Sequence, residues 1–189
     1  MNKGFSLSAN IENGFPADVQ YIVTPNGRKA AQNIIDDFHS GIHSFTIIGT
    51  YGTGKSSFLL ALEADLSQDN KTKRLLNPKN LSQTADFEIL NIVGDYMELS
   101  TLLGRKLNVD GHSQSILDEL KKYYNHLKEQ NKFLLIVIDE FGKVLEHAAK
   151  NKSCSIGSTK VISLKRPFTF VHSFFCVSVR FLAYAPKFW

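Results

Sequence analysis

The sequence lacks most of the features that mark disulfide-bonded, zinc-binding or membrane-spanning proteins. Its 189 residues include only two cysteines, Cys154 and Cys176, and neither has a His or second Cys at zinc-ligand spacing. The N-terminus has no apolar run typical of a secretory signal. No stretch of about 18 residues is apolar and uncharged enough to span a bilayer. We therefore expect a soluble, cytoplasmic protein with no membrane partner, in which a disulfide would be unusual.

Acidic residues are missing from the end of the chain. Residues 1–150 hold 16 Lys/Arg and all 18 Asp/Glu, a net charge of −2, whereas residues 151–189 hold 6 Lys/Arg and no acid. From residue 152 onward Asn and Gln are absent too, although six Phe and six Ser occur. The overall charge of +4 thus comes from the tail. It is no argument that residues 1–150 bind nucleic acid. We expect an N-terminal extension (1–17), a core domain (18–150) and an atypical basic, Phe/Ser-rich tail (151–189).

Apolar periodicity in the core domain predicts alternating strands and helices. Strands are expected at 45–48, 87–94 and 132–142, and helices at 26–40, 55–66, 95–107, 113–131 and 143–150. A short extended segment is expected at 18–25, and a polar surface loop at 67–85. The strand at 132–142 contains an uninterrupted apolar run at 133–138, which is typical of a strand covered on both faces. Strands joined by long crossovers indicate a mostly parallel sheet in an α/β fold of three layers, α/β/α.

The stretch "GTYGTGKSS", residues 49–57, carries the phosphate-loop pattern Gly-x-x-x-x-Gly-Lys-Ser between an expected strand and an expected helix. Its glycines let backbone N–H groups turn toward an anion, and the helix start adds a positive dipole end. Lys55 would contact the β- and γ-phosphates, and the Ser56 hydroxyl would be a ligand of Mg²⁺. The pattern predicts ATP contacts along the loop, from Gly49, Thr50, Tyr51, Gly52, Thr53, Gly54, Lys55, Ser56 and Ser57.

The second half of the site is expected where the strand 132–142 ends. Asp139 closes the run "LLIVID", where its carboxylate can hold Mg²⁺ through a water beside Ser56. Glu140 follows, and a carboxylate there can polarise a water toward the γ-phosphate. The alternative is that both acids only cap the next helix, since acids favour first turns; the upstream phosphate loop favours the functional interpretation. Lys55 and Glu140 are therefore the candidate catalytic residues, and Ser56 and Asp139 the candidate metal ligands.

These motifs together resemble a known class of ATPases. Lys55 and Asp139 are 84 residues apart with room for a strand between them. With "YIVTP", "IIGTYGTGKSSFL" and "IVIDEFGK", this resembles the AAA+/STAND-type P-loop ATPases of the Orc1/Cdc6-like kind, in the additional-strand, catalytic-glutamate division, over about residues 15–150. The resemblance implies adenine contacts at Tyr21, Ile22 and Val23. It also implies an arginine supplied by a neighbouring subunit, and hence a homo-oligomer or partner protein.

Such ATPases continue with a sensor strand and a helical lid, and here the tail departs from them. The segment "SFFCVSVRF" stands where the sensor strand is expected, and no lid follows it. Two explanations stay open: a genuine short last strand, or a frameshift or early end that truncates a longer ATPase and leaves the fold incomplete at its C-terminus. The sequence predicts Mg-ATP binding, with hydrolysis weak or absent in this chain alone. The alternative is a non-catalytic nucleotide-binding fragment of a longer ATPase.

Other functions fit the residues less well. A GTPase would need a carboxylate where "NKSC" (151–154) has Cys154, which cannot accept the hydrogen bonds from guanine. A small-molecule kinase would need lid arginines, but no Arg occurs between Arg105 and Arg166. The basic, Ser-rich stretch 150–166 leaves nucleic-acid contact open, although its composition without aromatic residues is more typical of a solvated linker.

Overall fold

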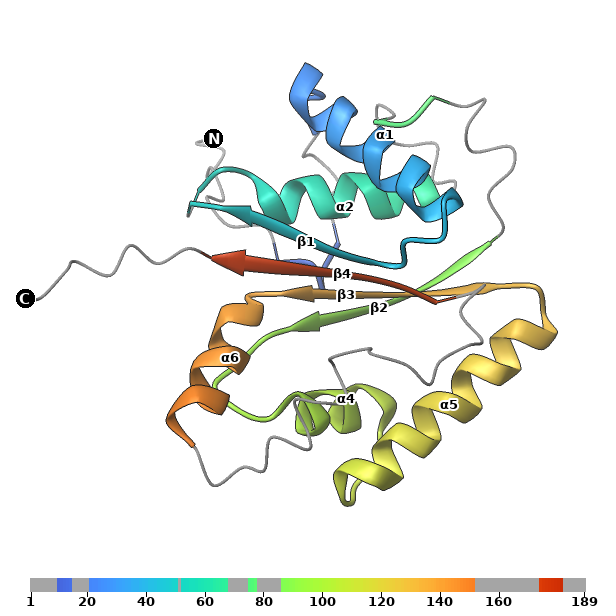
Figure 1. Cartoon of the computed structure of the whole chain (residues 1–189), viewed down its shortest axis with the longest axis vertical. Coiled ribbons are helices and arrows are strands. Elements are labelled where there is room, and N and C mark those ends of the chain that lie inside the picture. Colours follow the sequence, from blue (N-terminus) through green and yellow to red (C-terminus); the bar gives the residue numbers. More distant parts are fainter. Residues whose placement is uncertain are drawn as a thin grey trace, which may run out of the picture.

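A parallel sheet of four strands forms the centre of the molecule. The structure is a computed structural model that describes residues 10–14, 21–50, 52–67, 75–77, 86–151 and the backbone of 174–181. The strands are β1 (Ser44–Gly49), β2 (Phe87–Val93), β3 (Phe133–Asp139) and β4 (Phe174–Phe181). They lie in the order β1-β4-β3-β2, and every neighbouring pair is parallel. All four arrowheads in Figure 1 therefore point the same way.

Helices cover both faces of this sheet. Figure 1 shows α1 (Pro25–His39) and α2 (Lys55–Leu66) above it, and α4 (Leu99–Leu107), α5 (Ser113–Glu129) and α6 (Phe141–Lys150) below it. The fold is thus the expected three-layer α/β/α arrangement with a parallel sheet. Within the described ranges, no helix is long and apolar enough to span a membrane.

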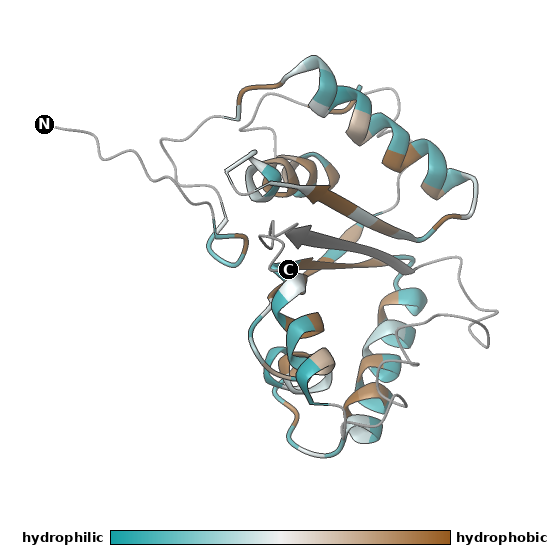
Figure 2. Ribbon diagram, turned by 60° about the vertical axis from the view of Figure 1, so that its left-hand side comes forward, coloured by the Kyte–Doolittle hydropathy of each residue, from teal (hydrophilic) through white to brown (hydrophobic). Residues whose placement is uncertain are grey.

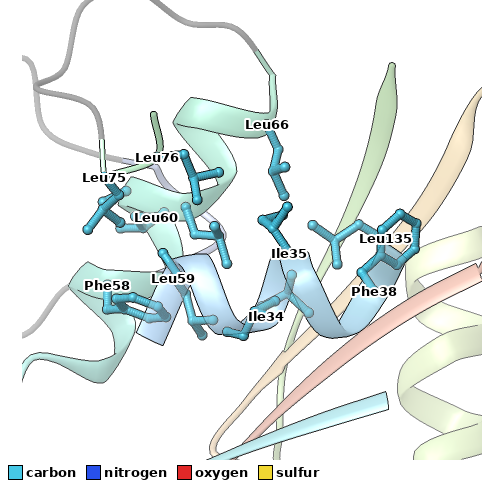
Figure 3. Close-up of a cluster of buried hydrophobic side chains, with 14 of the residues drawn as sticks. Ile34, Ile35, Phe38, Phe58, Leu59, Leu60, Leu66, Leu75, Leu76 and Leu135 are labelled. Carbon is cyan, nitrogen blue, oxygen red and sulfur yellow. The ribbon is translucent and has the colours of Figure 1, made fainter. Parts of the chain in front are cut away.

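Two hydrophobic cores lie on opposite faces of the sheet because side chains alternate along a strand. On β3, Leu135 and Val137 pack in the first core with α1 and α2, whereas Leu134, Ile136 and Ile138 pack in the second with α4, α5 and α6. All five are at most 4% exposed, as predicted for a strand covered on both faces. Figure 3 shows Leu135 among the first-core side chains of α1 and α2, and Figure 2 shows brown apolar strands between helices of mixed polarity.

Most predicted elements are confirmed to within a few residues, and one boundary differs more. The helix expected at 95–107 begins only at Leu99. Asp95 instead folds the chain into a turn: its Oδ1 accepts a hydrogen bond from the backbone N–H of Tyr96, and its carbonyl accepts one from Met97. Short acidic side chains that bond their own backbone in this way favour turns over helix interiors.

The prediction of a polar surface loop at 67–85 is partly wrong. Leu75 and Leu76 within it are fully buried in the first core. The N–H of Leu76 donates to Oδ2 of Asp65 on α2 at 2.7 Å, and Asp65 itself is buried. The apolar pair interrupts an otherwise polar stretch, so hydrophobic burial and one buried hydrogen bond override its loop-like composition. Ile11, in the expected N-terminal extension, is also buried in this core.

The tail contributes the strand β4 to the middle of the sheet. Residues 44–49 of β1 pair with 176–181 of β4, and 134–138 of β3 pair with 174–178. A strand therefore lies between β1, which leads into the phosphate loop, and β3, which ends at Asp139.

Candidate functional site

The site residues come from chain segments that follow three parallel strands. The phosphate loop follows β1, the pair Asp139–Glu140 ends and follows β3, and Gly94 follows β2. The carboxyl ends of parallel strands lie at one edge of a sheet, which is where ligands bind in open α/β folds. The topology alone thus brings together residues that are up to 91 positions apart in the sequence, from Gly49 to Glu140.

The phosphate loop has the backbone that its glycines allow. Gly52 and Gly54 have φ angles of 77° and 79°, in the left-handed region that side chains with a Cβ rarely adopt. The loop is closed on itself, since the Thr53 hydroxyl donates to the carbonyl of Thr50 at 2.8 Å. Gly54 then starts α2, and its carbonyl accepts the N–H of Phe58 at 2.8 Å. Tyr51, the remaining predicted contact in the loop, lies outside the described residues.

Lys55 is folded into the loop that it follows. Its Nζ donates to the carbonyls of Gly49 at 3.0 Å and Thr50 at 2.5 Å, and lies 3.4 Å from the Thr53 hydroxyl. The residue is only 7% exposed, and burial lowers the pKa of its ammonium, an effect that the charge of Asp139 opposes. A cation held mainly by neutral carbonyls at a helix N-terminus attracts an anion strongly.

Ser56 and Asp139 meet directly across the site. The Ser56 hydroxyl donates to Oδ2 of Asp139 at 2.7 Å, although the two residues are 83 positions apart. Oδ1 of Asp139 accepts the backbone N–H of Glu140 at 2.9 Å, and the residue is 4% exposed. Both groups offer hard oxygen atoms. The described residues contain no cluster of three or more His, Cys, Asp or Glu that could hold a metal, at this site or at any other. One carboxylate and one hydroxyl suit Mg²⁺, which keeps waters and takes further ligands from phosphates.

Glu140 lies at the turn between β3 and α6, one residue beyond Asp139. Its φ and ψ are 51° and 30°, a left-handed conformation that is uncommon for a residue with a side chain. Its carboxylate pairs with the Nζ of Lys143 on the first turn of α6. This hydrogen bond raises the pKa of Lys143, and the charges of Asp95 and Asp139 add to the effect while burial opposes it. Among the described contacts the Glu140 side chain meets Lys143, not the phosphate loop.

The structure does not gather the three predicted adenine contacts into one surface. Ile22 is 82% exposed, whereas Tyr21 and Val23 are partly buried against the first core. All three precede α1, whose N-cap Thr24 accepts the N–H of Gly27 at 3.1 Å. Ser57, another predicted contact, is half-buried on the first turn of α2.

Sequence reasoning missed two features close to the site. Gly94 donates its N–H to the carbonyl of Asp139 at 2.7 Å. Its position directly after an apolar strand was a usable signal, because strand ends meet at one edge. The second is a buried polar pair: Asn91 of β2 donates from Nδ2 to Glu63 of α2 at 2.8 Å and to the carbonyl of Ile11 at 3.0 Å. The two acids in "FLLALEADL" gave only a weak signal, since Asp and Glu side chains in a helix usually face solvent.

Comparison with known proteins shows the fold. No protein-family model matches the chain, and a search of curated proteins also gives no match. Among solved structures, the ORC2 protein of Aeropyrum pernix in ADPNP–ADP complexes matches with a TM-score of 0.59 at 17% identity, over 90% of this chain and 44% of that one. The Drosophila ORC bound to DNA matches with a TM-score of 0.56 at 13% identity, over 95% of this chain and 47% of that one.

The ADP form of the same Aeropyrum pernix protein has a TM-score of 0.54 at 19% identity. This chain therefore shares the α/β fold of these ORC structures. It spans less than half the length of the solved chains that it resembles.

Proposed function

We propose that this chain binds ATP together with Mg²⁺ at the phosphate loop and Asp139, and that it is the nucleotide-binding part of an AAA+-type ATPase. The observation that carries the proposal is the 2.7 Å contact between the Ser56 hydroxyl and the Asp139 carboxylate, directly beside the buried Lys55. It joins a hydroxyl and a carboxylate suited to Mg²⁺ with a cation suited to phosphate. The neighbouring ORC2 structures, solved with ADPNP and ADP, support a nucleotide as the ligand.

Each residue has a role that follows from its contacts. The Lys55 ammonium, which now donates to two loop carbonyls, would donate to the β- and γ-phosphate oxygens. Ser56 and Asp139 would hold the Mg²⁺ that neutralises the phosphates. Glu140 would orient a water and accept its proton at a carboxylate oxygen. Pairing with Lys143 keeps that carboxylate on the first turn of α6.

A second candidate is a nucleotide-binding unit that does not turn over by itself. One observation favours it: the Glu140 carboxylate pairs with Lys143 on the first turn of α6. Turnover by this chain alone is accordingly expected to be weak. Completion of the site would then need a partner protein or a second copy that supplies an arginine.

Binding and turnover can be tested separately. A fluorescent ATP analogue titrated with and without Mg²⁺ should bind the wild-type chain, and Lys55→Ala should weaken binding by about 100-fold, equivalent to about 3 kcal/mol. Lys122→Ala is the matched control, because Lys122 forms an exposed i,i+3 ion pair with Glu119 away from the loop. Equal affinity of the wild-type chain and Lys55→Ala would refute the assigned site.

Phosphate release then separates the two candidates. If the chain is an ATPase, Glu140→Gln should preserve binding and lower the rate by about 100-fold or more. If the wild-type chain binds Mg-ATP but releases no phosphate, the non-catalytic candidate is supported. A wild-type rate that Glu140→Gln leaves unchanged would show that the role given to Glu140 is wrong.

The solved structures that resemble this chain are the basis for proposing which process the nucleotide drives. One of them is an ORC bound to DNA, so DNA-associated work is the first function to test. Retention of labelled duplex DNA by the chain with Mg-ATP, compared with Mg-ADP, would test it. Equal and salt-insensitive retention in both states would argue against a nucleotide-controlled DNA contact.

A further inference from the structure

Gly94 lies where the end of β2 touches the turn that carries Asp139 and Glu140. It is buried, and its N–H donates to the carbonyl of Asp139 at 2.7 Å. A Cβ built on Gly94 would lie 2.5 Å from the backbone oxygen of Glu140, 2.9 Å from its carbonyl carbon and 3.0 Å from the carbonyl oxygen of Asp139. These are all backbone atoms, which cannot rotate away as a side chain can. Any other residue at 94 must displace the turn.

The turn itself is held in an uncommon conformation by its surroundings. Glu140 has a φ of 51°, which for a residue with a Cβ costs roughly 1–2 kcal/mol. Its N–H donates to Oδ1 of Asp139, its carbonyl accepts the N–H of Lys143 at 3.0 Å, and the carbonyl of Asp139 accepts the N–H of Gly94. Backbone strain of this kind persists only where the packing around it determines the conformation.

We propose that Gly94 is a positioning residue of the nucleotide site: its lack of a side chain lets the Asp139–Glu140 turn approach β2 and so sets where both carboxylates leave the sheet. The inference rests on the proposed function and deepens it. Gly94 acts through the backbone of its neighbours. The Asp139 carboxylate, 2.7 Å from the Ser56 hydroxyl, would shift with the turn. Misplacement of a catalytic group by about 1 Å can lower a rate by about 100-fold.

Gly104 offers an internal control. A Cβ on Gly104 would lie 2.7 Å from the carbonyl oxygen of Val109 and 2.9 Å from Cδ1 of Ile116. It therefore also meets a backbone carbonyl, but on α4, which packs in the second core away from the loop. Gly104→Ala measures the cost of forcing a methyl group against the backbone. A loss seen in Gly94→Ala and not in Gly104→Ala then belongs to the site.

The experiment compares both variants in the full chain, at a temperature well below their melting points. The readout is the increase in affinity for the fluorescent ATP analogue when Mg²⁺ is added, with phosphate release as a second measure. Gly94→Ala should reduce the Mg²⁺-dependent increase by about 10-fold or more and leave metal-free binding near the wild-type value. Gly104→Ala should lower the melting temperature but change neither quantity.

A measurement on the wild-type chain covers the case in which Gly94→Ala does not fold. In a chain labelled with ¹⁵N-glycine, the amide resonance of Gly94 should move when Mg²⁺ is added to the ATP-bound protein, and that of Gly104 should not. An unmoved Gly94 resonance would overturn the role of Gly94 but not the proposed function. So would a folded Gly94→Ala variant that keeps the full Mg²⁺-dependent increase in affinity for the ATP analogue. A wild-type chain without Mg²⁺-dependent ATP binding would overturn the proposed function and, with it, the role of Gly94.

Discussion

Glu63 should make the folded state less stable as the pH rises, and Glu63→Gln should remove this effect. The residue lies on α2 and is 8% exposed. Burial raises the pKa of its carboxyl from 4.5 to about 7; the charge of Asp139 adds to this rise, and the hydrogen bond from Asn91 opposes it. Within the described part of the chain, Oε1 of Glu63 and Oδ1 of Asn91 are buried and have no hydrogen-bond partner. Two unpaired acceptors in this position disfavour the ionised form.

The sign and size follow from linkage. Because the pKa is higher in the folded chain than in the unfolded one, the folded state binds the proton more tightly. The contribution to stability is fully present below pH 4.5 and is lost as the pH rises through about 7. A shift of this size corresponds to about 3 kcal/mol. Glu63→Gln cannot ionise, and its amide can still accept from Asn91, so its stability relative to the wild type should increase by about that amount between pH 4.5 and 8.

Urea unfolding followed by circular dichroism at several pH values, at constant ionic strength, measures this difference. Subtracting the two curves cancels the other titrating groups, provided that they behave alike in both proteins. Glu119→Gln is the control, because Glu119 pairs with Lys122 on the exposed face of α5. Wild-type and Glu63→Gln curves that run parallel across this pH range would refute the reasoning, as would an equal effect of Glu119→Gln.

Two further predictions concern the metal site and the segment at 75–77. Ser56→Ala should leave metal-free ATP binding intact and weaken the Mg²⁺-dependent increase in ATP affinity by about 10-fold, because Asp139 loses its 2.7 Å hydroxyl partner. A titration of Mg²⁺ into the nucleotide-bound protein measures this change. An unchanged titration would exclude Ser56 as a metal ligand. Asp65→Ala should lower the free energy of unfolding by about 1–3 kcal/mol, since the buried N–H of Leu76 loses its acceptor. Asp118→Ala, on an exposed pair with Lys121, should change it by less than about 1 kcal/mol; equal losses in both would contradict the assignment.

Local sequence patterns were sufficient for much of the fold. The uninterrupted apolar run at 133–138 predicted a strand covered on both faces, and the structure buries Leu134 to Ile138 as expected. Gly52, Gly54 and Lys55 occur in a pattern whose geometry is local, so the closed loop was also predictable. In both cases the signal is a pattern of neighbouring residues.

Contacts between segments that are distant in the sequence could not be predicted from local patterns. Composition marked 67–85 as a surface loop, but Leu75 and Leu76 find room in the first core, which only the packing of α1 and α2 creates. Glu63 is buried for the same reason, because α2 presents that part of its surface to Asn91 on β2. Whether a side chain in a polar or mixed stretch is buried depends on what covers it, and its neighbours in sequence do not contain that information.

By itself, then, the sequence determined the α/β class, the glycine-rich loop and the choice of Lys55, Ser56 and Asp139 as candidate site residues, because short motifs and apolar periodicity are properties of neighbouring residues. Only the tertiary structure decided that β4 lies between β1 and β3, and that the Ser56 hydroxyl donates directly to the Asp139 carboxylate. It also decided that Gly94 must be without a side chain, because the backbone that would collide with one belongs to another strand end. Strand order and close backbone approach depend on segments that are distant in the chain, and they become visible only when those segments are packed together.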